Sequence, residues 1–166
     1  MRIIFLLLIV FLLAACEEKK DDDVIINANY FSYQGTKHYT PNAFYVVESN
    51  GIELVISSFI YDSSTGEYSG SGDGVDFVKL KSSYTNKLPV GTFQSYINWG
   101  DTASNFLGLM LMDVDKLYYG NYTEWEINSG FVSISESPKG YLITYEVFVD
   151  DTIQIKGTYE GSVIKN

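Results

Sequence analysis

The chain has little of several residue types that functional sites commonly use. Among its 166 residues there is one cysteine and one histidine, and its only arginine is Arg2. A single cysteine cannot form an internal disulfide. One cysteine and one histidine also cannot supply the nitrogen and sulfur ligands of a zinc-type site. We therefore expect a fold without disulfides, with no metal, no cofactor and no catalytic residue that the sequence identifies.

Positive charge is also scarce. The formal net charge is −10, and removing Arg2 with the N-terminal segment discussed below deepens it by one, to −11. Nucleic-acid binding through phosphate contacts needs a basic patch, and the sequence shows none. The acidic balance also argues against electrostatic adhesion to an anionic membrane surface, and it favours solubility.

Long apolar runs are limited to the N-terminus, where Ile3 to Leu13 follow Arg2 and precede Ala14 and Ala15. Eleven helical residues span about 16 Å at a rise of 1.5 Å each. That is roughly half of the ~30 Å hydrocarbon core of a bilayer. A basic start, a short apolar middle and a small-residue end are instead typical of a secretory signal over residues 1–15.

The order Leu13-Ala14-Ala15-Cys16 resembles the lipobox of bacterial lipoproteins. The resemblance implies a diacylglycerol in thioether linkage to the Cys16 sulfur, with cleavage that leaves Cys16 as the new N-terminus. Several acyl chains anchor a protein stably, because each buried CH₂ contributes about 0.8 kcal/mol. The implied partner is therefore a membrane, reached through lipid on Cys16.

A charged segment follows this cysteine. In the segment 16–23, Cys16 is followed by five acids and two lysines, and such a run is typical of a flexible tether. The step Lys20-Asp21-Asp22 resembles the surface-export signal of lipoproteins of Bacteroidota. That resemblance implies an outer-membrane, cell-surface-exposed address, and a periplasm-facing lipoprotein is the alternative.

Residues 24–166 have the composition of one β-rich domain. Aromatic residues make up 16% of the chain, with 14 Tyr, and no apolar pattern at helical spacing persists beyond about two turns. Strict alternation of apolar and polar residues predicts strands over 141–149 and 153–163. Further strands are predicted at Ile25–Tyr33, Ala43–Glu48, Ile52–Ile60, Val75–Lys81, Gly91–Tyr96, Phe106–Met112 and Gly130–Glu136.

Turn residues separate these strands in hairpin order. They are Gln34-Gly35, Asn50-Gly51, Pro138-Lys139-Gly140 and Asp150-Asp151. We therefore predict an all-β fold, first a β-sandwich of about nine or ten antiparallel strands, with a lipocalin-like closed barrel as the alternative.

Two further features of the β-region bear on the fold. Gly157 and Gly161 fall on the apolar face of the last strand, where they permit bending or close approach in either architecture. From Tyr84 onward the order of β-segments is similar to that of small β-rich lipoproteins of Bacteroidota of unassigned function. This likeness implies the fold and the lineage, and it implies no site.

Two aromatic segments between predicted strands are the leading candidates for ligand contact. Flat rings beside Asn, Asp and Glu acceptors suit stacking against sugar rings or peptide partners. The candidate ligand-binding residues are Tyr96, Trp99, Tyr119, Tyr122 and Trp125. The alternative is that these rings close the ends of the β-fold.

Other candidates have weaker signatures. As the only histidine, His38 would have to be the base of any Ser-His-Asp triad, but the strand–turn–helix serine elbow of such hydrolases is missing from the sequence. We therefore expect His38 to be a surface residue without a catalytic role. The acidic segments Ser71–Asp76 and Asp113–Asp115 offer oxygen ligands for calcium, although neither matches the twelve-residue calcium loop, and plain acidic turns are the alternative. Thr102 and Thr152 lie in tripeptides that resemble the O-glycosylation motif of exported Bacteroidota proteins.

These features together predict an outer-membrane, lipid-anchored, non-enzymatic binding or accessory lipoprotein, with a glycan or an envelope protein as its ligand. The alternatives are a structural or adhesin-type assembly subunit and a carrier of a small apolar ligand inside a closed barrel. A hydrolase ranks last, because 21 acidic residues will place some carboxylate pair at glycosidase spacing by chance.

Overall fold

Every regular element that the structure describes is a β-strand. The computed structural model describes residues 29–49, 51–62, 65, 67–80, 87–95, 105–114 and 123–166. The strands are β1 (Tyr30–Tyr33), β2 (Thr36–Tyr39), β3 (Asn42–Glu48), β4 (Gly51–Ser57), β5 (Ile60–Asp62), β6 (Glu67–Ser69), β7 (Gly72–Leu80), β8 (Gly91–Ser95), β9 (Asn105–Val114), β10 (Thr123–Ser137), β11 (Gly140–Val149), β12 (Ile153–Gly161) and β13 (Ile164–Lys165). The predicted all-β class is confirmed.

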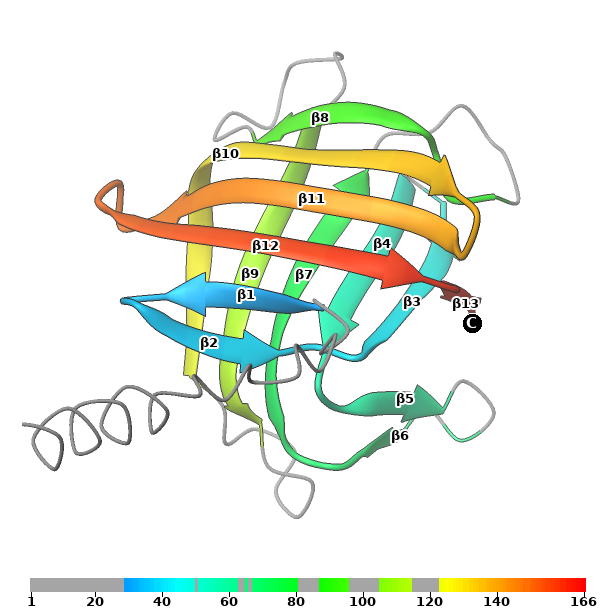
Figure 1. Cartoon of the computed structure of the whole chain (residues 1–166), viewed down its shortest axis with the longest axis horizontal. Coiled ribbons are helices and arrows are strands. Elements are labelled where there is room, and N and C mark those ends of the chain that lie inside the picture. The colour runs from blue at the N-terminus through cyan, green and yellow to red at the C-terminus, as the bar shows by residue number, and fades with distance from the viewer. Residues whose placement is uncertain are drawn as a thin grey trace, which may run out of the picture.

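Eleven of these strands form one strongly curled sheet, and β5 and β6 form a separate two-stranded ribbon (Figure 1). The strand order is β13-β3-β4-β7-β9-β8-β10-β11-β12-β1-β2, with an additional pairing of β9 with β10. Most neighbours are antiparallel, but β8 runs parallel to β9, and β13 runs parallel to β3. The terminal strands of this order, β2 and β13, do not pair with each other, so the sheet is an open half-barrel.

The predicted β-sandwich is therefore wrong, and the closed barrel offered as its alternative is wrong too. Alternation along a strand decides which side chains face inward, but a sandwich and a curled sheet share that alternation. Strand β10 separates the two architectures. Its residues Thr123–Glu126 pair with β9, while Phe131–Ile134 pair with β8, so this one strand belongs to both halves of the curl.

A β-bulge lets β10 turn this corner. The register of β10 against β11 shifts between Ile127 and Ser129. Gly130 follows with a φ of 116°, and a Cβ there would collide with the carbonyl oxygen of Glu146. Bulges bend a strand and increase its twist, and only glycine tolerates this conformation and this approach. The bend in β10 therefore depends on Gly130.

The hydrophobic core lies on the inner side of the curl. The predicted alternation along β11 and β12 is confirmed, with Ile143, Val147 and Ile155 fully buried. The ring of Phe77 on β7 meets the ring of Tyr145 on β11 with their centroids 5.2 Å apart. Side chains from the two halves of the sheet thus pack directly against each other.

Gly157 provides the close approach that the sequence predicted. It lies opposite Tyr145 in the β11–β12 register, and a Cβ on Gly157 would collide with the phenol ring. The Tyr145 ring fills the space of the missing side chain. Its hydroxyl is buried without a hydrogen-bond partner among the described residues, and burial raises its pKa.

The predicted hairpins are confirmed, although one turn and some strand bounds differ. Gln34 and Gly35, with φ of 49° and 81°, join β1 to β2, as a two-residue turn with two positive φ angles requires. The hairpin of β3 and β4 is present, but Gly51 pairs with Glu48 and begins β4 instead of lying in the turn, and Asn50 lies outside the described residues. The 138–139 and 150–152 turns flank β11. The strand predicted over Ile52–Ile60 instead ends at Ser57, and Ile60 begins β5.

Candidate functional site

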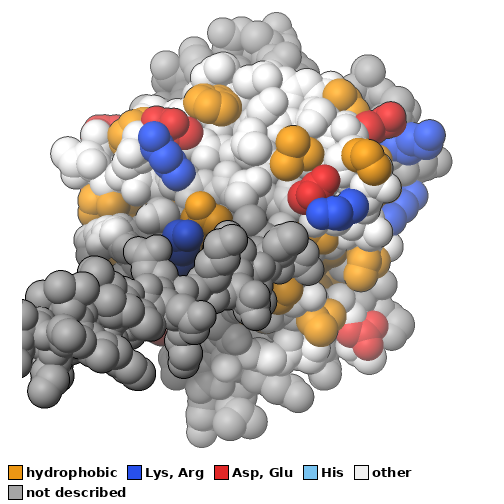
Figure 2. Space-filling view, in the orientation of Figure 1, with side chains coloured by type: hydrophobic (Ala, Val, Ile, Leu, Met, Phe, Trp, Pro, Cys, Tyr) orange, Lys and Arg blue, Asp and Glu red, His pale blue; other side chains and the backbone are white. Residues whose placement is uncertain are grey.

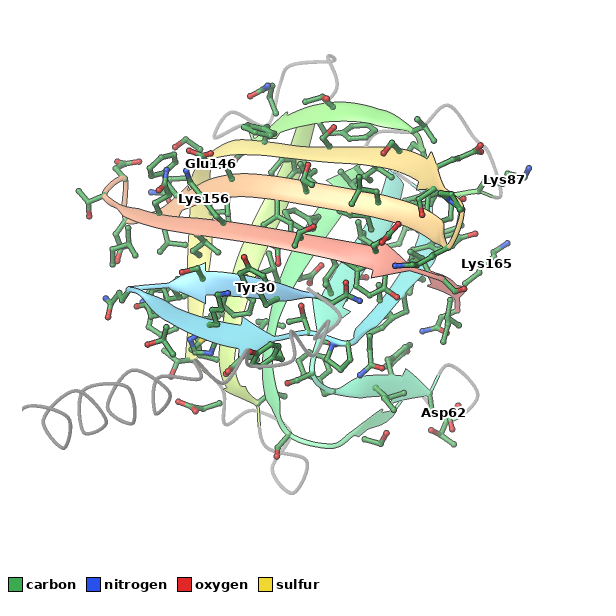
Figure 3. The ribbon with its side chains drawn as sticks, in the orientation of Figure 1. Tyr30, Asp62, Lys87, Glu146, Lys156 and Lys165 are labelled. Carbon is green, nitrogen blue, oxygen red and sulfur yellow. The ribbon has the colours of Figure 1, made fainter. Side chains whose placement is uncertain are left out.

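The outer face of β12, β1 and β2 carries a groove with a volume of about 300 Å³. The two strand pairings place its residues in adjacent rows, with Tyr30 opposite Thr158, and Ser32 between Lys156 and Lys37. Figure 3 shows Tyr30 and Lys156 on neighbouring strands of this face. The lining residues are Tyr30, Ser32, Lys37, Lys156, Gly157 and Thr158.

These side chains point outward because side chains alternate between the two faces of the sheet along each strand. Phe31 on β1 and Ile155 on β12 are fully buried in the core. Their neighbours along each strand therefore face the opposite side of the sheet. On β2, the same alternation turns His38 inward against Phe31 and leaves Lys37 on the outer face.

Lys37 and Tyr30 form a cation–π contact at the groove. The Lys37 Nζ lies 4.4 Å from the centroid of the Tyr30 ring. At an exposed position such a contact contributes about 0.5–1 kcal/mol. The contact holds an ammonium group and an aromatic ring together on one side of the groove.

Lys156 supplies a second ammonium group, which is partly engaged. Its Nζ lies 3.3 Å from a carboxylate oxygen of Glu146 on β11, and its side chain remains 56% exposed. The Gln154 amide donates to the other oxygen of Glu146 at 2.6 Å. Figure 3 shows Glu146 beside Lys156 on β11, outside the row that lines the groove.

The described lining of the groove combines several kinds of chemical group. Figure 2 leaves part of this face uncovered, and acidic, basic and hydrophobic side chains lie interspersed there. The described lining of the groove offers a ligand one aromatic ring, the hydroxyls of Ser32 and Thr158, and two ammonium groups. Such a set can hold a hydroxylated ligand through stacking and hydrogen bonds.

Of the predicted ligand-binding aromatics, only Trp125 is described. Tyr96, Trp99, Tyr119 and Tyr122 lie outside the described residues. Trp125 on β10 is half-buried against the core, with its ring centroid 5.9 Å from that of Tyr33. This packing favours a structural role for Trp125, and convergence of the five rings on one site stays a prediction.

His38 is not the surface residue that the sequence predicted. Its side chain is 15% exposed, it stacks on Phe31 at 4.9 Å, and its Nδ1 lies 2.7 Å from a carboxylate oxygen of Asp73. The β1–β2 register opposes His38 to Phe31 on the inner face, which explains the burial. The pair links the edge strand β2 to β7.

The acidic segments considered for calcium have other partners. Besides His38, Asp73 accepts a hydrogen bond from the backbone N–H of Asp113 at 3.0 Å, so both of its oxygens are used. Asp115 lies outside the described residues. Within the described part of the chain, no group of three or more His, Cys, Asp and Glu residues could hold a metal ion.

Asp76, the last residue of the candidate segment Ser71–Asp76, is buried and paired with Glu53, which the sequence did not predict. It is 8% exposed, and burial raises its pKa well above the usual value, with the charges of Glu53 and Glu48 adding to the rise. A hydrogen bond joins the carboxyls of Asp76 and Glu53. A protonated Asp76 donating to an ionised Glu53 satisfies this geometry. The sequence signal is an acid between apolar neighbours, Val75 and Phe77.

The predicted modification and anchoring residues differ in whether they are described. Thr152 is exposed in the β11–β12 turn, and Thr102 lies outside the described residues, so O-glycosylation stays a prediction. The signal over 1–15, the tether over 16–23 and Cys16 also lie outside them. In the described part of the chain, no helix is long and apolar enough to cross a membrane.

The sequence did not identify Tyr30, Lys37 and Lys156 as a site. Alternation in the last strand could place Lys156 on the polar face, and the Gln34-Gly35 turn could place Lys37 near Ser32. The pairing of β1 with β12 joins segments from opposite ends of the domain. No local pattern indicates that pairing.

Fold and groove together define an all-β half-barrel with a polar groove on its outer face. The chain matches no protein-family model, and comparisons with curated proteins and with solved structures found no match. The proposal for its function therefore rests on the groove and on the N-terminal sequence.

Proposed function

We propose that this protein is a lipid-anchored, non-enzymatic binding lipoprotein of the outer membrane, exposed at the cell surface, with a glycan as its ligand. The observation that carries the proposal is the groove on β12, β1 and β2. It presents the Tyr30 ring and the hydroxyls of Ser32 and Thr158 from paired strands. Strands hold such groups more rigidly than loops do, which lowers the entropic cost of binding.

The N-terminal sequence supports the anchoring part of the proposal. Leu13-Ala14-Ala15-Cys16 resembles a lipobox, and the acidic segment after it resembles a surface-export signal. A lipid on Cys16 would keep the domain at the membrane, and the tether would leave the β-domain free to meet ligands in solution.

The packed interior argues against the carrier hypothesis. Inside the curl, the ring of Phe77 meets the rings of Phe106 and Tyr145, each at a centroid distance of 5.2 Å. All three side chains are buried. Within the described residues the inner side of the sheet is therefore filled by the protein's own side chains, where a carrier needs room for its ligand.

One observation favours the alternative of an assembly subunit. Strand β2 ends the sheet, and its outer edge pairs with no strand among those described. Exposed edges can add a strand from a partner. Analytical ultracentrifugation of the detergent-solubilised chain tests this alternative, and a monodisperse monomer that co-purifies with no envelope protein contradicts it.

Glycan binding can be tested directly with the full chain in detergent. We expect hits on an array of oligosaccharides, and calorimetric affinity for a hit to fall at least about tenfold in Tyr30→Ala. Stacking of a nucleic-acid base on one aromatic ring is worth roughly 1–3 kcal/mol, and we expect a sugar ring to gain a similar amount. Leu142→Ala, at an exposed residue of β11 on the same face, is the control and should bind normally. No binding to any oligosaccharide would contradict the proposal.

A further inference from the structure

We infer that the groove binds a carboxylated saccharide, a glycan that contains uronic acid residues, an inference that rests on the proposed glycan-binding function. The observation behind it is the charge of the lining. Among the described residues that line it, two of six are lysines and none is acidic, in a chain whose formal net charge is −10. The described lining therefore differs in charge from the acidic chain that carries it.

The two lysines are spaced to grip one ligand from two sides. Lys156, Ser32 and Lys37 lie side by side on β12, β1 and β2. Neighbouring strands are about 4.8 Å apart, so the Cα atoms of the two lysines are separated by roughly 10 Å. A sugar ring seated over Ser32 can place a carboxylate toward either ammonium group.

Lys37 is the better prepared of the two. Its contact with the Tyr30 ring holds the ammonium group at 4.4 Å from the ring centroid before any ligand arrives. A carboxylate that joins this pair gains a charge-assisted hydrogen bond, and the sugar to which it belongs lies next to the Tyr30 ring. Ring and charge then recognise adjacent parts of one residue of the glycan.

Lys156 is available to a ligand because its present partner holds it weakly. The Lys156–Glu146 pair is exposed, with side chains 56% and 35% accessible. Exposed ion pairs contribute little, and Gln154 can keep Glu146 in place when Lys156 turns to a ligand. Glu146 thus competes with the ligand carboxylate.

The charge of the whole chain limits which anions can bind. A net charge of −10 repels densely charged polymers at long range, and the described lining of the groove offers two cations. Short carboxylated oligosaccharides meet this condition. The hydroxyls of Ser32 and Thr158 would bind sugar hydroxyls in both charged and neutral glycans, so the lysines alone decide the preference for an acid.

The experiment measures calorimetric affinity of the full chain in detergent for trimers of galacturonate and of mannuronate, each beside its methyl ester. We expect at least one acid to bind about tenfold more tightly than its ester. Lys37→Met and Lys156→Met should each reduce this ratio toward one, while Glu146→Gln should tighten acid binding several-fold. Lys139→Met, which removes an exposed lysine of the β10–β11 turn paired with Glu160, is the control. Circular dichroism checks that each variant folds.

The outcomes separate this inference from the proposal beneath it. If acids and esters bind equally and Tyr30→Ala weakens both, the groove binds glycans but does not select acids, and the inference is overturned. If the acids bind and the double variant Lys37→Met/Lys156→Met retains the preference, the lysines are not its source, which also overturns the inference. If neither trimer nor any array glycan binds, the proposed function fails.

Discussion

At the scale of single residues, Asp76 and Tyr145 are two of the described residues that bury a polar atom without a hydrogen-bond partner, which lowers stability. Asp76 lies on β7 with one oxygen that has no partner among the described residues, and its other contact is with Glu53. The Tyr145 hydroxyl is likewise buried and has no hydrogen-bond partner among the described residues. Burying each of these groups costs desolvation free energy, and a substitution of similar shape that removes the polar atom can recover it.

Asp76 makes stability depend on pH, and its sign follows from the raised pKa. Because the folded pKa lies above the unfolded value of 3.8, the folded state holds a proton that the unfolded state releases. This contribution is complete below the unfolded pKa and is lost as the pH rises through the folded pKa. We expect Asp76→Asn to raise the free energy of unfolding at pH 8 by about 1–3 kcal/mol.

Urea titrations between pH 4 and pH 8 measure this effect. The native protein should lose stability across the interval relative to Asp76→Asn, whose amide can still donate to Glu53. Glu126→Gln, at an exposed residue of β10, is the control and should run parallel to the native protein. Parallel curves for Asp76→Asn and the native chain would show that Asp76 is not protonated in the fold.

Two identical substitutions test the cost of the buried Tyr145 hydroxyl. Tyr145→Phe should leave stability unchanged or raise it by up to about 1 kcal/mol, because only an unpaired hydroxyl is removed. Tyr159→Phe should lower it by about 1 kcal/mol, because the Tyr159 hydroxyl donates to the Ser162 carbonyl at 2.6 Å. Thermal unfolding of both variants measures the difference, and equal losses would mean that Tyr145 has a partner.

At the scale of elements, β10 connects the two halves of the curled sheet. Its first residues pair with β9, its later ones with β8 and β11, and the register shift at Ile127–Ser129 separates these segments. A straight β10 could not meet both sets of partners, because the sheet changes direction between them. The shape of the sheet therefore depends on a few residues of one strand.

Gly130→Ala tests this dependence. We expect a loss of about 3 kcal/mol or more in the free energy of unfolding, from the positive φ together with the collision with Glu146. Gly35→Ala is the matched control, because its φ is also positive but no atom lies within 4 Å of the added Cβ. It should cost only about 1 kcal/mol of backbone strain. Equal losses of unfolding free energy for the two variants, measured by chemical denaturation, would show that close packing around Gly130 does not hold β10 in shape.

At the scale of the whole molecule, Cys16 is predicted to decide where the β-domain resides. We expect Cys16→Ser, produced in a bacterial host with an outer membrane, to abolish incorporation of radiolabelled palmitate and to move the protein out of the membrane fraction. The β-domain itself should fold normally, because the described strands begin at Tyr30. A Cys16→Ser protein that stays in the membrane fraction would contradict the anchor.

Much of the β-structure could be predicted from short segments alone. Alternation along β11 and β12 predicted which side chains are buried, and the turns at Gln34-Gly35 and Pro138-Lys139-Gly140 predicted hairpins. Gly157 predicted a close approach that Tyr145 then occupies. These features are local, with a period of two residues or a turn of two, so the sequence by itself determined them.

Only the tertiary structure decided the half-barrel and the groove. The pairings of β1 with β12 and of β9 with β10, and the parallel pairs of β8 with β9 and β13 with β3, join residues that no local pattern relates. His38 was misplaced for the same reason, since its partner Asp73 belongs to another strand. Alternation along a strand predicts which face of the sheet a side chain occupies, but the identity of the partner strand decides which residues lie beside it. Which strands pair depends on packing the whole core at once.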